Sequence, residues 1–154
     1  QVIPVGSSMG GWQSLLLARA RPERLAGLVT IAAAPDFTED GWWAGFDADQ
    51  KAQMEAQGRV ELPSDYMEPY VVTKRMIDDG RAHLVLRDAL ELPVSVRMLQ
   101  GTADTAVSVA TATQLLEHIS SPDAQLLLVK DADHRFSDKL CLDLIEAAVQ
   151  EVSG

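Results

Sequence analysis

Short apolar runs alternate with segments of helical periodicity along most of the chain. The apolar runs, which suit buried strands, cover residues 2–5, 28–32, 94–99 and 126–129. The helical segments, in which apolar residues recur every three or four positions, cover residues 9–20, 108–119 and 137–153. Strands that alternate with helices predict an α/β fold, with a mostly parallel sheet and helices on its faces. Pro4 is an objection to the first strand, because proline cannot donate a hydrogen bond to a sheet ladder.

Residues 36–91 interrupt this alternation, and they hold both tyrosines and two of the three tryptophans. We interpret them as a helical cap inserted into a core of residues 1–35 and 92–154. Turn and capping residues predict one cap helix over residues 47–57 and a second over residues 69–80.

The aromatic and thioether side chains of this predicted cap offer a large, adaptable apolar surface for an acyl chain. The residues that could line such a pocket are Trp42, Trp43, Phe46, Met54, Tyr66, Met67 and Tyr70. We predict that the five aromatic members contact the substrate. The alternative is that these side chains only pack the cap onto the sheet.

The charge balance narrows the range of partners. Lys and Arg number 13 against 23 Asp and Glu, which gives a formal net charge of −10. Because phosphate backbones bind basic surfaces, no nucleic-acid partner is predicted. No run of 18 apolar residues occurs in the sequence, so no membrane span is predicted.

The single cysteine, Cys141, falls on the apolar face of the last helical segment, and we interpret it as a core residue. One thiol forms no internal disulfide, which is compatible with a reducing compartment. The cysteine count alone fixes no compartment, and we predict a cytoplasmic location.

The sequence Gly6-Ser7-Ser8-Met9-Gly10 lies between the first apolar run and the first helical segment. This G-x-S-x-G pattern predicts a sharp, strained turn from a strand into a helix, with the serine exposed at its tip. The flanking glycines are expected to let neighbouring backbone pass where a Cβ atom would collide. Ser8 is therefore the candidate nucleophile.

A serine nucleophile needs a base within hydrogen-bond reach, and that base needs a carboxylate on its other ring nitrogen. His83 follows a turn and His118 lies near the end of a helical segment, and we interpret both as surface or half-buried residues. His134 follows the apolar run 126–129 by a short polar loop. It is predicted at the carboxyl end of a buried strand, where α/β sheets hold their sites. His134 is the candidate base.

Asp104 is the candidate carboxylate, because it lies in the loop Gly101-Thr102-Ala103-Asp104 shortly after the apolar run 94–99. The chain order Ser, Asp, His is the order of an α/β-hydrolase sheet. Two alternatives stay open: Asp104 only caps the following helix, or Asp36, after the second strand, supplies the carboxylate.

Asp131 and Asp133 also lie close to His134 in the sequence. No second histidine or cysteine stands at a spacing typical of a zinc site, so we predict no metal site. We interpret Asp131 and Asp133 as residues that solvate their loop.

Three segments resemble those of one branch of the α/β-hydrolase superfamily: residues 6–12, residues 101–107 and the tripeptide Asp133-His134-Arg135. That branch includes bacterial hydrolases and the mitochondrial palmitoyl-protein thioesterase that also cleaves acyl glucuronides. The resemblance covers nearly the whole chain and implies a triad of the three candidate residues that works without a cofactor. The implied reaction is cleavage of a small-molecule carboxylic ester or thioester through an acyl-enzyme.

Oxyanion stabilisation in this superfamily uses the backbone N–H of the residue after the nucleophile, here Met9, and an N–H from a loop before the elbow. Because the chain begins at Gln1, almost inside a strand, we interpret it as the C-terminal part of a larger enzyme. We expect it to be inactive alone, since losing one oxyanion donor costs on the order of 10²–10³ in turnover. We also expect poor solubility, because the first strand would lack a neighbour.

Two other functions stay open at this point. A non-catalytic binding protein of the same fold would keep the elbow only as architecture. A peptidase or a carbon–carbon bond hydrolase would use the same triad on a different substrate.

Overall fold

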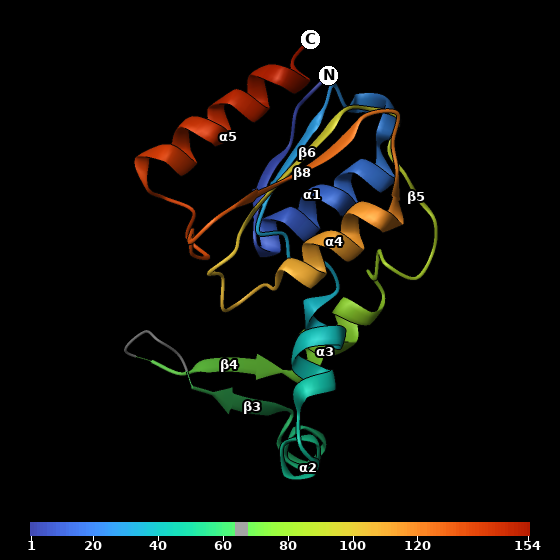
Figure 1. The fold of residues 1–154 in the computed structure, drawn as a ribbon. Helices are drawn as coiled ribbons and strands as arrows, with labels where there is room; N and C mark the ends of the chain where they lie inside the picture. Colours follow the sequence, from blue (N-terminus) through green and yellow to red (C-terminus); the bar gives the residue numbers. More distant parts are fainter. Residues whose placement is uncertain (64–67) are drawn as a thin grey trace. The chain divides into compact units, whose positions relative to one another are not determined.

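The computed structural model describes residues 1–63 and 68–154, which form two compact units (Figure 1). The core unit consists of Gln1–Pro35 and Val85–Gly154, and the cap unit consists of Asp36–Leu84. The cap unit is therefore shorter than the predicted insertion of residues 36–91.

Residues 85–91 belong to the core unit because their own contacts lie there. Val85 and Leu90 are buried, and strand β5 (Leu90–Glu91) pairs in parallel with strand β7 (Ile119–Ser120). This pairing is made with a segment far along the chain, so the local sequence does not reveal it.

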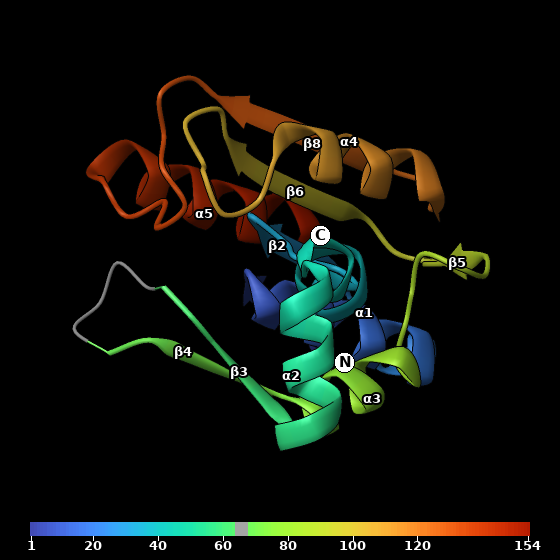
Figure 2. The same ribbon diagram turned by 90° about the horizontal axis from the view of Figure 1, so that it is seen from below.

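The central sheet of the core unit has four parallel strands in the order β1-β2-β6-β8 (Figure 2). The strands are β1 (Val5–Ser7), β2 (Leu28–Ile31), β6 (Val96–Gly101) and β8 (Ala124–Val129). The helices are α1 (Met9–Ala20), the 3₁₀ helix η1 (Pro22–Arg24), α4 (Val109–His118) and α5 (Lys139–Val152). The predicted α/β fold with a mostly parallel sheet is confirmed.

Helices cover both faces of this sheet, as Figure 1 shows: α5 lies on one face, and α1 and α4 lie on the other. A buried apolar cluster joins the sheet to α5 and includes Val29, Leu99, Phe136, Cys141 and Val152. Cys141 is fully buried in this cluster, as the periodicity of the last helical segment predicts. Burial raises the pKa of the Cys141 thiol to about 11, and the nearby Asp138 carboxylate adds to the effect.

Strand β1 begins at Val5, later than the apolar run 2–5 predicts. Pro4 has no N–H for the ladder, although its carbonyl accepts a hydrogen bond from Val29 N–H at 3.0 Å. Val2 forms only an isolated bridge with Leu25. Because β1 is an outer strand of the sheet, Val5 is 47% exposed.

The cap unit is not all helical. Its elements are the π-helix η2 (Phe37–Trp43), α2 (Ala48–Gln57), β3 (Arg59–Leu62), β4 (Tyr70–Thr73) and α3 (Lys74–Arg81). The predicted helix at 47–57 corresponds to α2, in which Asp47 and Gln50 form a capping box. Gly58 ends α2 in the left-handed conformation, with φ at 71°.

The predicted second cap helix, residues 69–80, is wrong in its first half. Tyr70–Thr73 form β4, which pairs antiparallel with β3, and the helix begins only at Lys74. The run Val71-Val72-Thr73 is β-branched and finds a partner strand, so strand pairing prevails over the helix-opening signal of Pro69. Thr73 then caps α3 by accepting a hydrogen bond from Met76 N–H.

No helix in the described part of the chain has both the length and the apolar character needed to cross a membrane.

Candidate active site

Ser8 lies at the turn between β1 and α1, at the carboxyl end of the sheet. Its backbone has φ at 54° and ψ at −120°, a strained conformation for a residue other than glycine. Four main-chain hydrogen bonds hold this turn: Ser8 N–H donates to Ile31 O, and Ser8 O accepts from the N–H groups of Gly11, Trp12 and Ala34. The strand-turn-helix geometry thus presents the Ser8 side chain at the tip of a sharp elbow.

The glycines around Ser8 differ in the space that a Cβ atom would have. A Cβ atom on Gly6 would collide with the carbonyl group of Gly10, and one on Gly11 would lie 2.7 Å from Ala33 Cβ. A Cβ atom on Gly10 would have open space. The expectation that both flanking glycines avoid a collision is therefore right for Gly6 and wrong for Gly10, because Gly10 already lies on the outside of α1.

His134 lies in the loop between β8 and α5. Asp133 shapes this loop, because its Oδ1 accepts hydrogen bonds from Arg135 N–H at 3.0 Å and Phe136 N–H at 3.2 Å. Phe136 has a φ of 51° and a fully buried side chain, which anchors the loop in the core. Asp133 is thus a structural residue of the turn and not only a solvated one. The bond to the N–H group two residues ahead makes an Asx turn. The sequence signal for this turn was an aspartate in a short polar loop.

The loops that carry Asp104 and His134 pack against each other. Ala103 N–H donates to Ala132 O at 3.0 Å, and Asp131 N–H donates to Thr102 Oγ1 at 2.8 Å. A Cβ atom on Gly101 would collide with Ala132 O, so only glycine permits this approach.

Ser8, His134 and Asp104 form a continuous hydrogen-bonded chain. Ser8 Oγ lies 3.0 Å from His134 Nε2, and His134 Nδ1 lies 2.8 Å from Asp104 Oδ2. An ionised carboxylate can only accept a hydrogen bond. The Nδ1 atom of His134 therefore carries the hydrogen and donates a hydrogen bond to Asp104 Oδ2. In the neutral ring, Nε2 is then left with its lone pair and accepts the hydrogen bond from the Ser8 hydroxyl.

The environment of Asp104 keeps it ionised. Its side chain is 0% exposed, whereas that of His134 is 32% exposed. Burial alone would raise the pKa of Asp104, but hydrogen bonds from Val107 N–H, His134 and Ala106 N–H outweigh it and hold the pKa below its usual value. The pair can therefore stabilise a positive charge that develops on His134.

The two alternatives for the carboxylate do not match the structure. Helix α4 is capped by Ser108, which accepts from Thr111 N–H, so Asp104 is not its cap. Asp104 and not Asp36 makes the carboxylate contact with His134 Nδ1. Asp36 is buried in a left-handed conformation just before η2.

Met9 is the first residue of α1, where a backbone N–H has no acceptor within the helix. In a nucleophile elbow, the N–H group of the residue after the nucleophile is an oxyanion donor, and here that residue is Met9.

The predicted substrate contacts of the cap have different surroundings. Phe46 is buried with Met54, Val60, Val72 and Ile77 in the core of the cap unit, and Trp42 and Trp43 pack partly buried against that core. Tyr70 is 48% exposed on β4, and Tyr66 lies outside the described residues. Packing within the cap explains the position of Phe46, and substrate contact stays a prediction for all five.

The ring nitrogens of the other two histidines contact backbone carbonyl groups. His83 Nδ1 lies 2.8 Å from Asp79 O in the cap unit. His118 Nε2 lies 3.0 Å from Val85 O and 2.9 Å from Asp88 O, so its ring nitrogen binds the segment that leads back from the cap.

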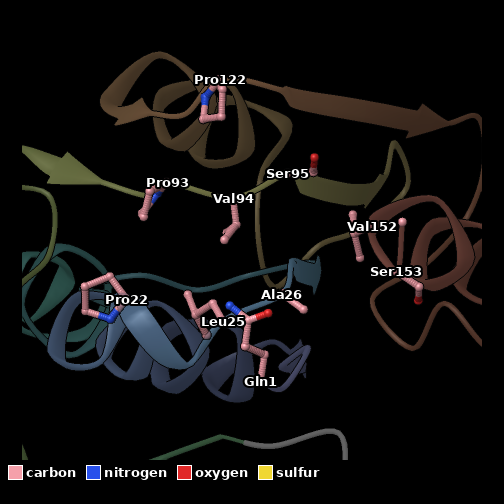
Figure 3. Close-up of a pocket in the computed structure, with 11 residues that line it drawn as sticks. Gln1, Pro22, Leu25, Ala26, Pro93, Val94, Ser95, Pro122, Val152 and Ser153 are labelled. Atoms are coloured by element: carbon pink, nitrogen blue, oxygen red, sulfur yellow. The ribbon is translucent and has the colours of Figure 1, made fainter.

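A separate cavity of about 590 Å³ lies at the opposite end of the core strands (Figure 3). Its lining includes Ala26, Ser95 and Pro122, which stand shortly before β2, β6 and β8. Ser8, Asp104 and His134 all follow the carboxyl ends of their strands, so this cavity is not part of the candidate site.

Several proteins are similar to this chain in sequence and in fold. The mitochondrial palmitoyl-protein thioesterase ABHD10 of Mus musculus is 31% identical over 152 residues, which cover 97% of this chain and 51% of the relative. The crystal structure of a putative hydrolase from Agrobacterium vitis S4 matches with a TM-score of 0.93 and 35% identity over 99% of this chain and 61% of that chain. The chain has the α/β-hydrolase fold.

The structure of α/β-hydrolase domain-containing protein 10 from mouse also matches this chain, with a TM-score of 0.86 and 29% identity over 97% of this chain and 60% of that chain. No family model matches the sequence. The chain spans about half the length of the curated relatives it matches.

Proposed function

We propose that this chain carries the nucleophile, base and acid of a serine hydrolase that cleaves carboxylic esters or thioesters through an acyl-enzyme. The observation that carries the proposal is the hydrogen-bonded chain from Ser8 Oγ through the His134 ring to Asp104. The strained backbone of Ser8 and the names of its relatives, a thioesterase and a hydrolase, support it.

In acylation, Ser8 Oγ attacks the carbonyl carbon of the substrate while its proton passes to His134 Nε2. Asp104 holds the Nδ1–H tautomer and stabilises the imidazolium that forms. The tetrahedral intermediate then collapses: the bond to the leaving oxygen or sulfur breaks, and His134 donates its proton to that atom. The acyl group remains on Ser8 as an ester.

Deacylation repeats these steps with water. A water molecule gives a proton to His134 Nε2 and attacks the acyl carbon, and the proton returns to Ser8 Oγ as the acid leaves. In both tetrahedral intermediates the carbonyl oxygen carries negative charge, and the Met9 N–H is the donor that this chain offers to it.

The substrate class is the acyl ester or thioester of a small molecule. Palmitoyl-protein is the substrate that the name of ABHD10 gives for that relative. For this chain, we propose only the kind of bond that is cleaved. Substrate profiling would identify the acyl chain.

A fluorophosphonate probe tests the proposal on the full-length gene product that carries these residues. We expect covalent labelling that disappears in Ser8→Ala, because the probe reacts with an activated serine hydroxyl. Ser7→Ala is the matched control: Ser7 is an exposed neighbour at the end of β1 and should leave labelling unchanged. A folded wild type that stays unlabelled, or labelling that persists in Ser8→Ala, would favour the non-catalytic binding protein.

Hydrolysis of a p-nitrophenyl ester and of an acyl thioester extends this test to turnover. Asp104→Asn keeps the shape of the side chain but removes the charge that orients His134. We expect it to lower kcat by about 10⁴, the size of effect that this change of a triad carboxylate has in a serine protease.

A further inference from the structure

Gln100 is a polar residue in an apolar place. It lies in β6 after the buried Met98 and Leu99, and it is itself fully buried. Glutamine is mostly exposed in proteins, so a buried one at this position requires hydrogen-bond partners.

The partners of its amide nitrogen are all acceptors. Gln100 Nε2 lies 3.1 Å from Asp104 Oδ2, 3.0 Å from Val107 O and 3.1 Å from Gly101 O. Rotating the amide by 180° would place its oxygen against these three oxygens. The contacts therefore require that the NH₂ group faces Asp104.

The amide oxygen of Gln100 has different surroundings. Gln100 Oε1 is buried and has no hydrogen-bond partner among the described residues. A buried carbonyl without a partner destabilises the folded state. The favourable contacts of Gln100 are therefore those of its NH₂ group, and one of them is to the carboxylate of Asp104.

Gln100 also completes the set of donors around the carboxylate. Asp104 Oδ1 accepts from Ala106 N–H and Val107 N–H, both at 2.8 Å. Oδ2 accepts from His134 and from Gln100. The backbone donors hold one oxygen, and without Gln100 the other oxygen would be held by His134 alone.

We propose that Gln100 is a positioning residue, whose amide holds Asp104 Oδ2 in line with His134 Nδ1. This inference rests on the proposed function, because it concerns the orientation of the base in that reaction. Gln100 contacts neither Ser8 nor a reacting atom, and it acts through Asp104.

The role has a consequence for the ionisation of His134. Around Asp104, the titratable group in contact is His134, and the other donors are two backbone N–H groups and the Gln100 amide. Removing the amide donor makes the carboxylate more basic. The more basic carboxylate binds the imidazolium more strongly, so the pKa of His134 should rise.

Gln100→Met tests the proposal in the full-length gene product, because methionine has a similar shape and no N–H group. We expect kcat for ester hydrolysis to fall about tenfold, the effect of one hydrogen bond to a charged group. The acidic limb of the kcat/KM profile should move to higher pH, a shift that a lower Tm from the lost bond to Val107 O would not produce by itself. Gln125→Met is the matched control: Gln125 Nε2 donates to Asp123 Oδ1 at 3.1 Å on exposed β8, so the same kind of bond is lost away from the site.

Gln100→Glu provides a second variant of nearly unchanged size. Its carboxyl group lies against Asp104 and can donate a hydrogen bond only while it is protonated. We expect kcat/KM to fall again at high pH, where the wild type keeps its plateau.

Titration of the His134 ring by NMR separates this inference from the proposed function. If the wild type shows turnover that depends on Ser8 but Gln100→Met matches it in kcat, pH profile and ring titration, the positioning role is wrong and the hydrolase stands. A lower kcat and Tm with an unchanged ring titration would equally reject the role, as a purely structural effect. If turnover that depends on Ser8 is absent, the proposed function fails, and a raised pKa of the His134 ring in Gln100→Met still supports the contact while an unchanged one rejects it.

Discussion

Gly6 and Gly10 flank Ser8 symmetrically in the sequence, but the structure places them in different surroundings. Gly6 lies in β1, where any side chain would meet the carbonyl group of Gly10. Gly10 lies in α1 with open space at its Cβ position. The close approach that the elbow requires is therefore made at Gly6 and again at Gly11, where α1 passes Ala33.

This difference predicts opposite outcomes for two alanine substitutions. Gly6→Ala should destabilise the protein by about 1–3 kcal/mol, because the backbone must shift to admit the methyl group. Gly10→Ala should leave stability unchanged or raise it by up to about 1 kcal/mol, since alanine is the better helix former. Urea unfolding of the full-length gene product measures both, and equal effects would contradict the assignment.

At the scale of single residues, Ser8, Asp104 and His134 could be selected from the sequence because each follows an apolar run in a short loop. Gln100 could not be selected in that way, because it lies within an apolar run and only the folded loop brings Asp104 Oδ2 to its amide.

At the scale of elements, Arg97 connects three parts of the core unit. Its side chain, on β6 and only 12% exposed, donates to Asp123 before β8 at 2.8 Å and to Glu151 at the end of α5 at 2.7 Å. These ion pairs join the start of β8 and the end of α5 to β6.

The Arg97 contacts predict how stability depends on pH in acid. Hydrogen bonds from Arg97 and Gln125 lower the pKa of Asp123 from its ordinary value of 3.8 to about 2. A depressed pKa in the folded state contributes stability that is present above about pH 3.8 and lost as the pH falls toward 2. We expect Asp123→Asn to flatten this part of the stability curve, as measured by urea unfolding between pH 2 and 5.

Ser121→Ala is the control for this experiment. Ser121 Oγ donates to Val94 O in the same turn, but it carries no titrating group. The control should shift the whole curve and keep its slope, and an unchanged slope in Asp123→Asn would contradict the role of the ion pair.

At the scale of the whole molecule, the core and cap units each have a buried apolar core of their own. Met54 is fully buried among Phe46, Val60, Val72 and Ile77 in the cap unit, and Met98 is buried on β6 in the core unit. Separate cores predict that the two units can lose structure separately.

Two methionine substitutions test this expectation. Met54→Ala and Met98→Ala should each cost about 2–5 kcal/mol of local stability, because each leaves a cavity. Backbone hydrogen exchange should accelerate in α2 and α3 for Met54→Ala, and in β2 and β6 for Met98→Ala. Equal acceleration of both sets by either substitution would show one cooperative unit instead.

The cytoplasmic location, the absence of a nucleic-acid partner and the substrate contacts of the cap stay predictions at this scale. Each depends on charge, cysteine content or composition, and none of these properties specifies a neighbour in space.

Sequence patterns were enough to predict the α/β class, the elbow at Ser8, and the loops in which the acid and the base lie. These features follow from local periodicity, from turn residues and from chain order, all of which act over a few neighbouring residues. Folding was needed to show that Tyr70–Thr73 form a strand, that residues 85–91 return to the core unit, and that Gln100 reaches Asp104. The first two outcomes depend on partner strands elsewhere in the chain, because a strand is stable only once its partner lies beside it. The third depends on the loop conformation that turns Asp104 back toward the buried amide four residues before it.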